Sequence, residues 1–226
     1  MKTFFAVMAV AGLAAGAVAD QTYNDTNGDV FTGAGGGILD ILSVEVSNTA
    51  TDISFKFTLA GDVIATDWGK YMVIIDRAAG GDTASNGWNR PISMTSGADS
   101  WIGSWVDGSL GAELYHYTGA WGLTEATYNG PPNNDISISK TQFSVTISTP
   151  LSALGVGIGD TFAFDAFTSG GGGGDGAIDS LGNPGIQVGD WGQPSNAVPQ
   201  NYTVVPAPGV LGLLGVGGLV AIRRRR

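Results

Sequence analysis

Closely spaced oxygen-bearing side chains lie near the start of the chain, in the run DTNGD at residues 25–29. Asp25, Asn27 and Asp29 stand at positions i, i+2 and i+4, the spacing that calcium-binding loops use for their first oxygen ligands. An EF-hand-type loop would also have glycine at its sixth position and an acidic residue at its twelfth, but Val30 and Gly36 stand there. The run is therefore either a turn or a looser calcium site that distant residues complete. Candidates for those distant ligands are Asp40, Asp175 and Asp179.

Tryptophan is the second residue type that could do chemistry, and the chain has six. An exposed indole ring binds sugars because its flat apolar face packs against their C–H groups. Trp101 and Trp105 lie on one face of an expected strand, where packing in the core is the simpler interpretation. Other tryptophans lie beside glycines and polar residues, where loops are expected. The candidate sugar contacts are Trp68, Trp88 and Trp121, with Arg90 either donating to hydroxyl groups or pairing with an aspartate.

The composition disfavours most catalytic and nucleic-acid-binding functions. The chain has no cysteine and one histidine, which excludes thiol chemistry and leaves few zinc sites. No motif places a Ser/His/Asp set, and the glycine run at 170–174 lacks the lysine of a phosphate-binding loop. Because 20 acidic residues outnumber 10 basic ones, phosphate backbones are repelled. We expect a non-catalytic protein without a nucleic-acid partner, with a carboxylate pair for glycoside hydrolysis as a remaining alternative.

The middle of the chain shows short segments of alternating apolar and polar residues, which indicate β-strands. Residues 71–75 form a continuous apolar run, which is typical of a central strand. Pro150 to Leu154 predicts a single helical turn. Many short strands between turns predict an all-β fold, an antiparallel, jelly-roll-like β-sandwich. The expected strands cover residues 42–47, 53–59, 71–75, 101–106, 113–117, 121–127, 143–147 and 162–166.

Residues 1–19 have the three parts of a secretory signal peptide. Lys2 supplies the positive start, and an uncharged apolar stretch follows it. Ala17 and Ala19 are the small residues that signal peptidase accepts at positions −3 and −1 of its cleavage site. We therefore expect an N-terminal signal helix that signal peptidase removes, so that Asp20 becomes the first residue of the exported protein.

The other end of the chain combines prolines, a short apolar segment and a basic cluster. As a helix, residues 209–222 would reach roughly 21 Å, short of the roughly 30 Å hydrocarbon core, so they predict a hydrophobic helix that anchors only transiently. The sequence resembles the PEP-CTERM sorting tail of Gram-negative bacteria, with Ala207 where glutamate is usual. That resemblance implies an exosortase-like sorting enzyme, transient retention in the inner membrane, and delivery to the outer surface or extracellular matrix. The residues that carry it are Pro206, Ala207, Pro208, Arg223, Arg224, Arg225 and Arg226.

The order of segments in the middle resembles the DOMON and family 9 carbohydrate-binding-module group of extracellular sandwiches. The resemblance rests on YMVIID at 71–76, GWNRPI at 87–92 and LSALG at 151–155. It implies sugar binding through aromatic residues or, in other branches of the group, haem or no known ligand. We expect a signal peptide (1–19), a β-sandwich domain (20–191), a linker (192–205) and a sorting tail (206–226). The expected function is binding of extracellular polysaccharide, with calcium as a possible cofactor. A structural surface or biofilm-matrix protein is the alternative, and an extracellular glycosidase is the third.

Overall fold

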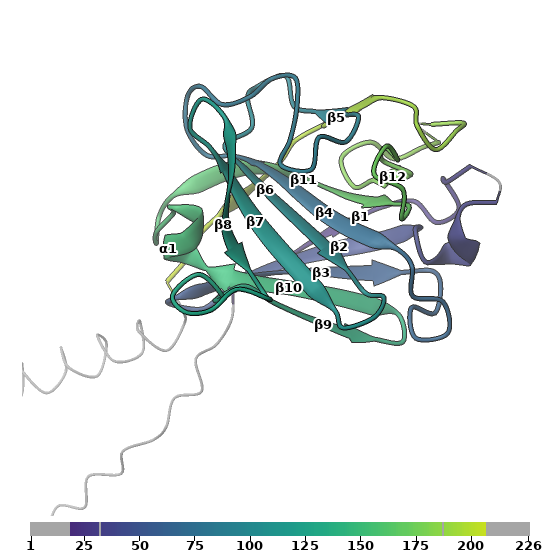
Figure 1. Cartoon of the computed structure of the whole chain (residues 1–226), viewed down its shortest axis with the longest axis horizontal. Coiled ribbons are helices and arrows are strands. Elements are labelled where there is room, and N and C mark those ends of the chain that lie inside the picture. Colours follow the sequence, from purple (N-terminus) through teal and green to yellow (C-terminus); the bar gives the residue numbers. More distant parts are fainter. Residues whose placement is uncertain (1–18, 32, 187, 207–226) are drawn as a thin grey trace, which may run out of the picture.

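The computed structural model describes residues 19–31, 33–186 and 188–206, and in this part of the chain almost all regular structure is β-strand (Figure 1). One sheet has five antiparallel strands. The only regular helical pieces in the described ranges are the single turns η1 (Gly35–Gly37) and α1 (Leu151–Leu154). The strands of the five-stranded sheet, in spatial order, are β1 (Ala19–Asn24), β2 (Ile41–Asn48), β3 (Asp52–Leu59), β10 (Ser144–Pro150) and β9 (Ser137–Thr141).

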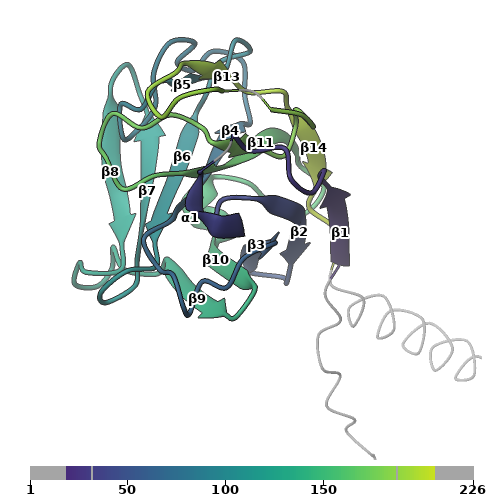
Figure 2. The same ribbon diagram turned by 90° about the vertical axis from the view of Figure 1, so that its right-hand side faces the viewer.

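The second sheet has seven strands and packs against the first, so that the chain forms two β-layers (Figure 2). The chain crosses between the sheets after β3, after β8 and after β10. Two short parallel strands, β5 (Ile92–Ser93) and β13 (Ser195–Asn196), form a separate ribbon. The seven-stranded sheet runs β12 (Asp179–Ser180), β11 (Thr161–Ser169), β4 (Lys70–Asp76), β6 (Ser100–Trp105), β7 (Gly111–Tyr117) and β8 (Trp121–Ala126), and β14 (Gln200–Thr203) also pairs with β11.

Two apolar clusters stabilise the sandwich, one on each face of the seven-stranded sheet. Alternation on β3 directs Phe55 and Phe57 into the main core between the layers, and β4 adds Val73 and Ile75 from the other side. Met72 and Ile74, which alternate with these residues along β4, point to the other face and belong to an outer cluster beneath covering loops. The continuous apolar run at 71–75 is therefore buried on both faces, as expected of a central strand. The outer cluster contains Met72, Ile74, Ile92, Met94, Ala98, Trp101, Phe167, Ala177 and Ala197.

The expected all-β architecture is confirmed, and each predicted strand overlaps an observed one. The prediction of a linker at 192–205 was wrong, because β13 and β14 lie there and pair with β5 and β11. These strands are too short for a periodic pattern, so composition alone suggested a linker. The expected signal helix, C-terminal helix and arginine cluster lie outside the described residues. Within those residues, no helix is long and apolar enough to cross a membrane.

Both ends of the described chain meet beside Asn48, at one end of the sandwich. Ala19 pairs with Asn48 across β1 and β2. The Asn48 side chain donates from Nδ2 to the Val205 carbonyl at 2.9 Å, and its Oδ1 accepts from the Tyr202 hydroxyl at 2.6 Å. We call this the terminal end. The opposite, distal end holds Ser169, where β11 ends, because β11 begins beside β14 at the terminal end.

Candidate functional site

Three aromatic rings form a row on the outer face of the seven-stranded sheet. The rings of Trp88 and Trp105 lie 6.4 Å apart with a 36° tilt, and those of Trp105 and Tyr128 lie 6.4 Å apart with a 32° tilt. Two strand glycines make room for them. A Cβ on Gly103 would lie 2.3 Å from the Trp88 ring, and a Cβ on Gly111 would lie 1.9 Å from the Trp105 ring. The tryptophans therefore lie directly on the sheet backbone, and Tyr128 is 60 % exposed.

A single carboxylate orients two rings of this aromatic row, those of Trp88 and Tyr128. Glu113, on β7, accepts hydrogen bonds from Trp88 Nε1 at 2.6 Å and from the Tyr115 hydroxyl at 3.0 Å. The Tyr128 hydroxyl donates to the other Glu113 oxygen. The hydrogen bond to Glu113, followed by burial and by the charge of Glu113, raises the pKa of Tyr128 to about 12. Because Trp88 and Tyr128 both donate to this anion, these two rings of the row are held in place before any ligand arrives.

Two grooves flank the glycine loop (residues 170–174) at the distal end. The larger, about 410 Å³, lies within the range of about 300–1,000 Å³ typical of small-molecule sites. We call it the Trp68 groove, and Trp68, Gly170, Gly171, Asp175 and Trp191 line it. The smaller, about 260 Å³, we call the Trp88 groove, and Lys70, Trp88, Arg90, Trp105 and Gly173 line it.

Arg90 connects the grooves by fixing the loop between them. Its Nη1 donates to Ser169 Oγ at 2.7 Å and to the Asp175 carbonyl at 2.9 Å, and its Nη2 donates to the Gly170 carbonyl at 3.3 Å. Only 7 % of Arg90 is exposed, and its guanidinium lies 5.3 Å from the centre of the Trp88 ring. Its main contacts are thus with the loop backbone.

The predicted sugar contacts do not form one surface. Trp88 and Arg90 share the Trp88 groove, and Trp68 lines the neighbouring groove, where its ring centre lies 5.9 Å from that of Trp191. Trp121 lies elsewhere, because it pairs with Tyr117 at the end of β7 far from the row. Its Nε1 donates to Asp82 Oδ2 at 2.9 Å.

The two tryptophans expected in the core have different environments. Trp101 is fully buried in the outer cluster, whereas Trp105 is half-buried and belongs to the aromatic row. Both lie on the same face of β6, but Trp101 is covered completely and Trp105 only in part. Trp105 is the last residue of β6, and it borders the Trp88 groove.

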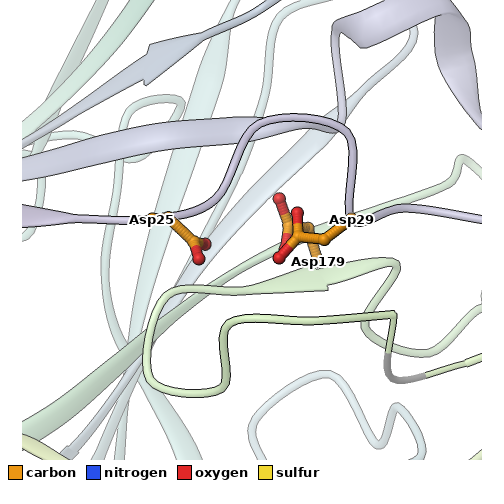
Figure 3. Close-up of side chains that lie close together, drawn as sticks. All are labelled: Asp25, Asp29 and Asp179. Carbon is orange, nitrogen blue, oxygen red and sulfur yellow. The ribbon is translucent and has the colours of Figure 1, made fainter.

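A separate acidic cluster lies where the loop after β1 meets β12. Asp25, Asp29 and Asp179 each contribute a carboxylate oxygen, and these oxygens lie within 4.8 Å of one another. Figure 3 shows the three side chains converging from the two segments. Asp29 is 5 % exposed, Asp179 is 1 % exposed, and Asp25 is half-buried. The ion pairs within the described residues involve other carboxylates.

Backbone donors satisfy only part of this cluster. Asp179 accepts from the Ile41 amide at 2.6 Å and from the Ser180 amide at 2.8 Å. Asp29 Oδ2 accepts from the Gly185 amide at 2.8 Å. Asp29 Oδ1 and Asp25 Oδ2 are buried without a hydrogen-bond partner in the described part of the chain. Two oxygens of the cluster are therefore desolvated and uncompensated.

Burial and mutual repulsion shift the ionisation of the cluster. Burial raises the pKa of Asp25 to about 7, and the charges of Asp29, Asp165 and Asp40 raise it further against the Thr26 hydrogen bond. Burial also raises the pKa of Asp179 to about 8, with Asp25 and Asp29 contributing. Without a cation, protons therefore partly neutralise these carboxylates near neutral pH.

The calcium-ligand prediction names two members of this cluster and one residue outside it. Asp25 and Asp29 come together, but Asn27 is exposed on the same loop, and Asp179 is the third acidic member instead. Asp40 holds the loop, since its two carboxylate oxygens accept from the Gly28 amide at 3.1 and 3.0 Å. Asp175 directly follows the glycine loop and accepts from the Gly172 amide.

Several residues of the grooves and of the aromatic row were missed by sequence reasoning. A signal for some of them was present in the strand glycines, because glycine inside a strand often marks close approach by another group. Gly103 stands between Trp101 and Trp105 in the sequence, and Gly111 pairs with Trp105. The residues missed are Lys70, Trp105, Glu113, Tyr128 and Trp191.

Comparison with models of known protein families finds no match to this sequence, and a search of curated proteins finds none either. The resemblances of the tail and of the middle segment therefore stay predictions. Function has to be argued from the two grooves and the acidic cluster.

Proposed function

We propose that residues 20–206 form a non-catalytic, jelly-roll-like carbohydrate-binding module that the cell exports and displays. The observation that carries the proposal is the aromatic row beside the Trp88 groove. Trp88 and Trp105 are half-buried, Tyr128 is exposed, neighbouring rings are tilted by 32–36°, and Glu113 accepts hydrogen bonds from Trp88 and Tyr128. Flat aromatic faces held in this way suit sugar rings, whose C–H groups pack on π-faces while their hydroxyls bond to polar edges.

The grooves on both sides of the glycine loop suit a chain of sugars better than a single one. Trp68 and Trp191 line one groove, and Trp88 and Trp105 line the other. Lys70 lies between the two grooves. It lines the Trp88 groove, and its Nζ donates to the Trp68 carbonyl at 3.1 Å. An extended polysaccharide could place successive rings in the two grooves.

The charges favour binding of a neutral polysaccharide without hydrolysis. Between residues 20 and 206 there are five basic and 20 acidic residues, a formal charge of −15, which repels anionic chains. The carboxylates nearest the aromatic row are already engaged, since Glu113 accepts three hydrogen bonds and Asp107 pairs with Lys70 at 2.9 Å. A general acid would need a carboxyl group free to donate its proton.

Export completes the proposal. The predicted signal peptide and the PEP-CTERM-like tail would take the module to the outer surface or extracellular matrix of a Gram-negative bacterium. Signal peptidase and an exosortase-like enzyme would act on the two ends, with transient anchoring in the inner membrane. Both ends of the described chain lie at the terminal end, away from the grooves, which would leave the grooves accessible on a tethered protein.

Screening the protein on a glycan array and measuring the best neutral polysaccharide by calorimetry tests this proposal. Trp88→Ala and Trp105→Ala should each weaken binding at least tenfold, since truncating an aromatic anchor of a binding site typically costs about 2 kcal/mol or more. Trp121→Ala is the matched control, because it removes a half-buried tryptophan from the same sheet outside both grooves. Its binding should equal that of the unaltered protein.

Two results would count against the proposal. If no glycan binds, the alternative of a structural surface or biofilm-matrix protein gains. If Trp121→Ala abolishes binding while Trp88→Ala does not, the ligand lies at the other end of β7. Circular dichroism of each variant separates lost contacts from lost folding.

A further inference from the structure

The acidic cluster has features that the proposed sugar site does not use. Its three carboxylates come from segments far apart in the sequence, yet no lysine or arginine of the described chain pairs with them. Asp29 is buried, and its Oδ1 has no hydrogen-bond partner there, as is also true of Asp25 Oδ2. Leaving buried anionic oxygens uncompensated is costly, so such oxygens normally belong to a pair or to a metal site.

The geometry of the cluster matches that of a bound ion. Ca²⁺ holds oxygen ligands at about 2.3–2.6 Å, so two ligands on opposite sides are at most about 4.6–5.2 Å apart. The carboxylate oxygens of Asp25, Asp29 and Asp179 lie within 4.8 Å of one another, with the two unpartnered oxygens among those available. The side chains in Figure 3 converge on one space from both segments.

We propose that Asp25, Asp29 and Asp179 bind one calcium ion. The donors are all oxygen, which suits a hard cation, and the cluster contains no histidine or cysteine to select zinc or copper. Mg²⁺ requires near-ideal octahedral geometry, whereas Ca²⁺ accepts irregular sets of carboxylates from loops.

The ion would join three segments of the distal end. Asp29 already contacts the loop after β12 through the Gly185 amide, and Asp179 contacts the start of β2 through the Ile41 amide. Calcium would add a direct link between the loop after β1, which carries Asp25 and Asp29, and Asp179 on β12. Because the unfolded chain does not bring these residues together, binding stabilises only the folded state.

Calorimetry and native mass spectrometry of the chelator-treated full chain with CaCl₂ test the proposal. We expect one ion per chain. At one hundred times the dissociation constant, the melting midpoint should rise by about 5–10 °C relative to EDTA. MgCl₂ at equal ionic strength should give less than half of that shift.

Asp29→Asn keeps an oxygen for the Gly185 amide but removes one charge. It should lose at least tenfold in calcium affinity and most of the thermal shift, while melting no lower than the unaltered protein in EDTA, because repulsion is relieved. Asp25→Asn, at a more exposed position, should weaken binding in the same way if Asp29→Asn does not fold. Asp175→Asn is the matched control, and its calcium response should be unchanged.

Three outcomes would overturn the proposal. In the first, the unaltered protein melts identically in calcium and EDTA. In the second, Asp29→Asn and Asp25→Asn both retain the full calcium response. In the third, Mg²⁺ and Ca²⁺ shift all variants equally, which indicates only screening of the acidic domain. None of these measurements depends on glycan binding, so the two proposals fail separately.

Discussion

Two strand glycines shape the aromatic site because they have no side chain. Trp88 lies over Gly103 and Trp105 lies over Gly111, so each indole contacts the sheet where any other residue would place a Cβ. Glu113 then fixes the edge of Trp88 through a hydrogen bond. At this scale, the absence of a methyl group determines how an aromatic ring can approach a strand.

Substitution of Gly103 tests this interpretation. In Gly103→Ala, the new Cβ would meet the Trp88 ring at 2.3 Å, so the ring has to shift and the hydrogen bond to Glu113 is strained. We expect a loss of about 1–3 kcal/mol in the free energy of unfolding, as in other overpacked sites, and weaker glycan binding. Gly122→Ala is the control, because nothing lies within 4 Å of its Cβ. Urea denaturation measures the free energy of unfolding of the two variants. Equal stability of the two would contradict the role of Gly103.

Among the elements, the short strand β14 connects the two sheets at the terminal end. It pairs with β11 at the terminal end, and its Tyr202 is buried against Phe162, with ring centres 5.7 Å apart. The Tyr202 hydroxyl donates to Asn48 Oδ1, and this bond joins β14 to the opposite sheet. Four residues therefore close the sandwich where the chain ends meet.

The ionisation of Tyr202 provides a pH test of this closure. Burial, and secondarily the charge of Asp20, raises the pKa of Tyr202 to about 12. The folded state thus holds the phenol proton more tightly than the unfolded chain, whose tyrosine pKa is about 10. The resulting stabilisation is fully present below pH 10 and is lost as the pH rises through about 12.

We expect Tyr202→Phe to cost about 0.5–1.5 kcal/mol at pH 8 by removing one buried hydrogen bond. Between pH 9 and pH 12 the variant should lose less stability than the unaltered protein, because it has no phenol to ionise at this position. Chemical denaturation at each pH gives both values. Parallel pH profiles for the two proteins would show that Tyr202 does not contribute to the alkaline transition.

At the scale of the described domain, the two ends of the described chain and the candidate sites lie at opposite ends of the sandwich. Ala19 and Val205 meet at Asn48, whereas the glycine loop follows Ser169 at the distal end of β11. The acidic cluster lies near that distal end, since Asp179 pairs with Thr168. A tail leaving after residue 206 would hold the module by the end away from its grooves.

Processing of the two ends should therefore leave the domain unchanged. We expect mass spectrometry of the exported protein to find Asp20 as its first residue and to find the segment beyond about Pro208 removed. The processed form should melt within about 1 °C of the full chain, because Val205 is the last residue bonded to the Asn48 side chain. A protein in the outer fraction that retains Arg223, Arg224, Arg225 and Arg226 would contradict sorting by cleavage.

The local features of this protein could be read from its sequence. Apolar and polar residues alternate along β2, β3 and β10, and β4 is apolar throughout, because each strand must suit the faces that it buries. The helical turn α1 was predicted separately, from the segment Pro150 to Leu154. The residue types that could bind sugar or calcium were also evident from local spacing, as were the apolar ends.

Only the tertiary structure decided which of those residues meet. Sheet order and register bring Asp179 to Asp25 and Asp29, leave Asn27 exposed, and place Trp105 beside Trp88 while Trp121 lies at the other end of β7. Strands β13 and β14 were missed because their pairing partners, not their own patterns, hold them in place. Alternation determines which face of a strand is buried, but contacts between distant segments depend on how the sheets assemble and on which loops cover them.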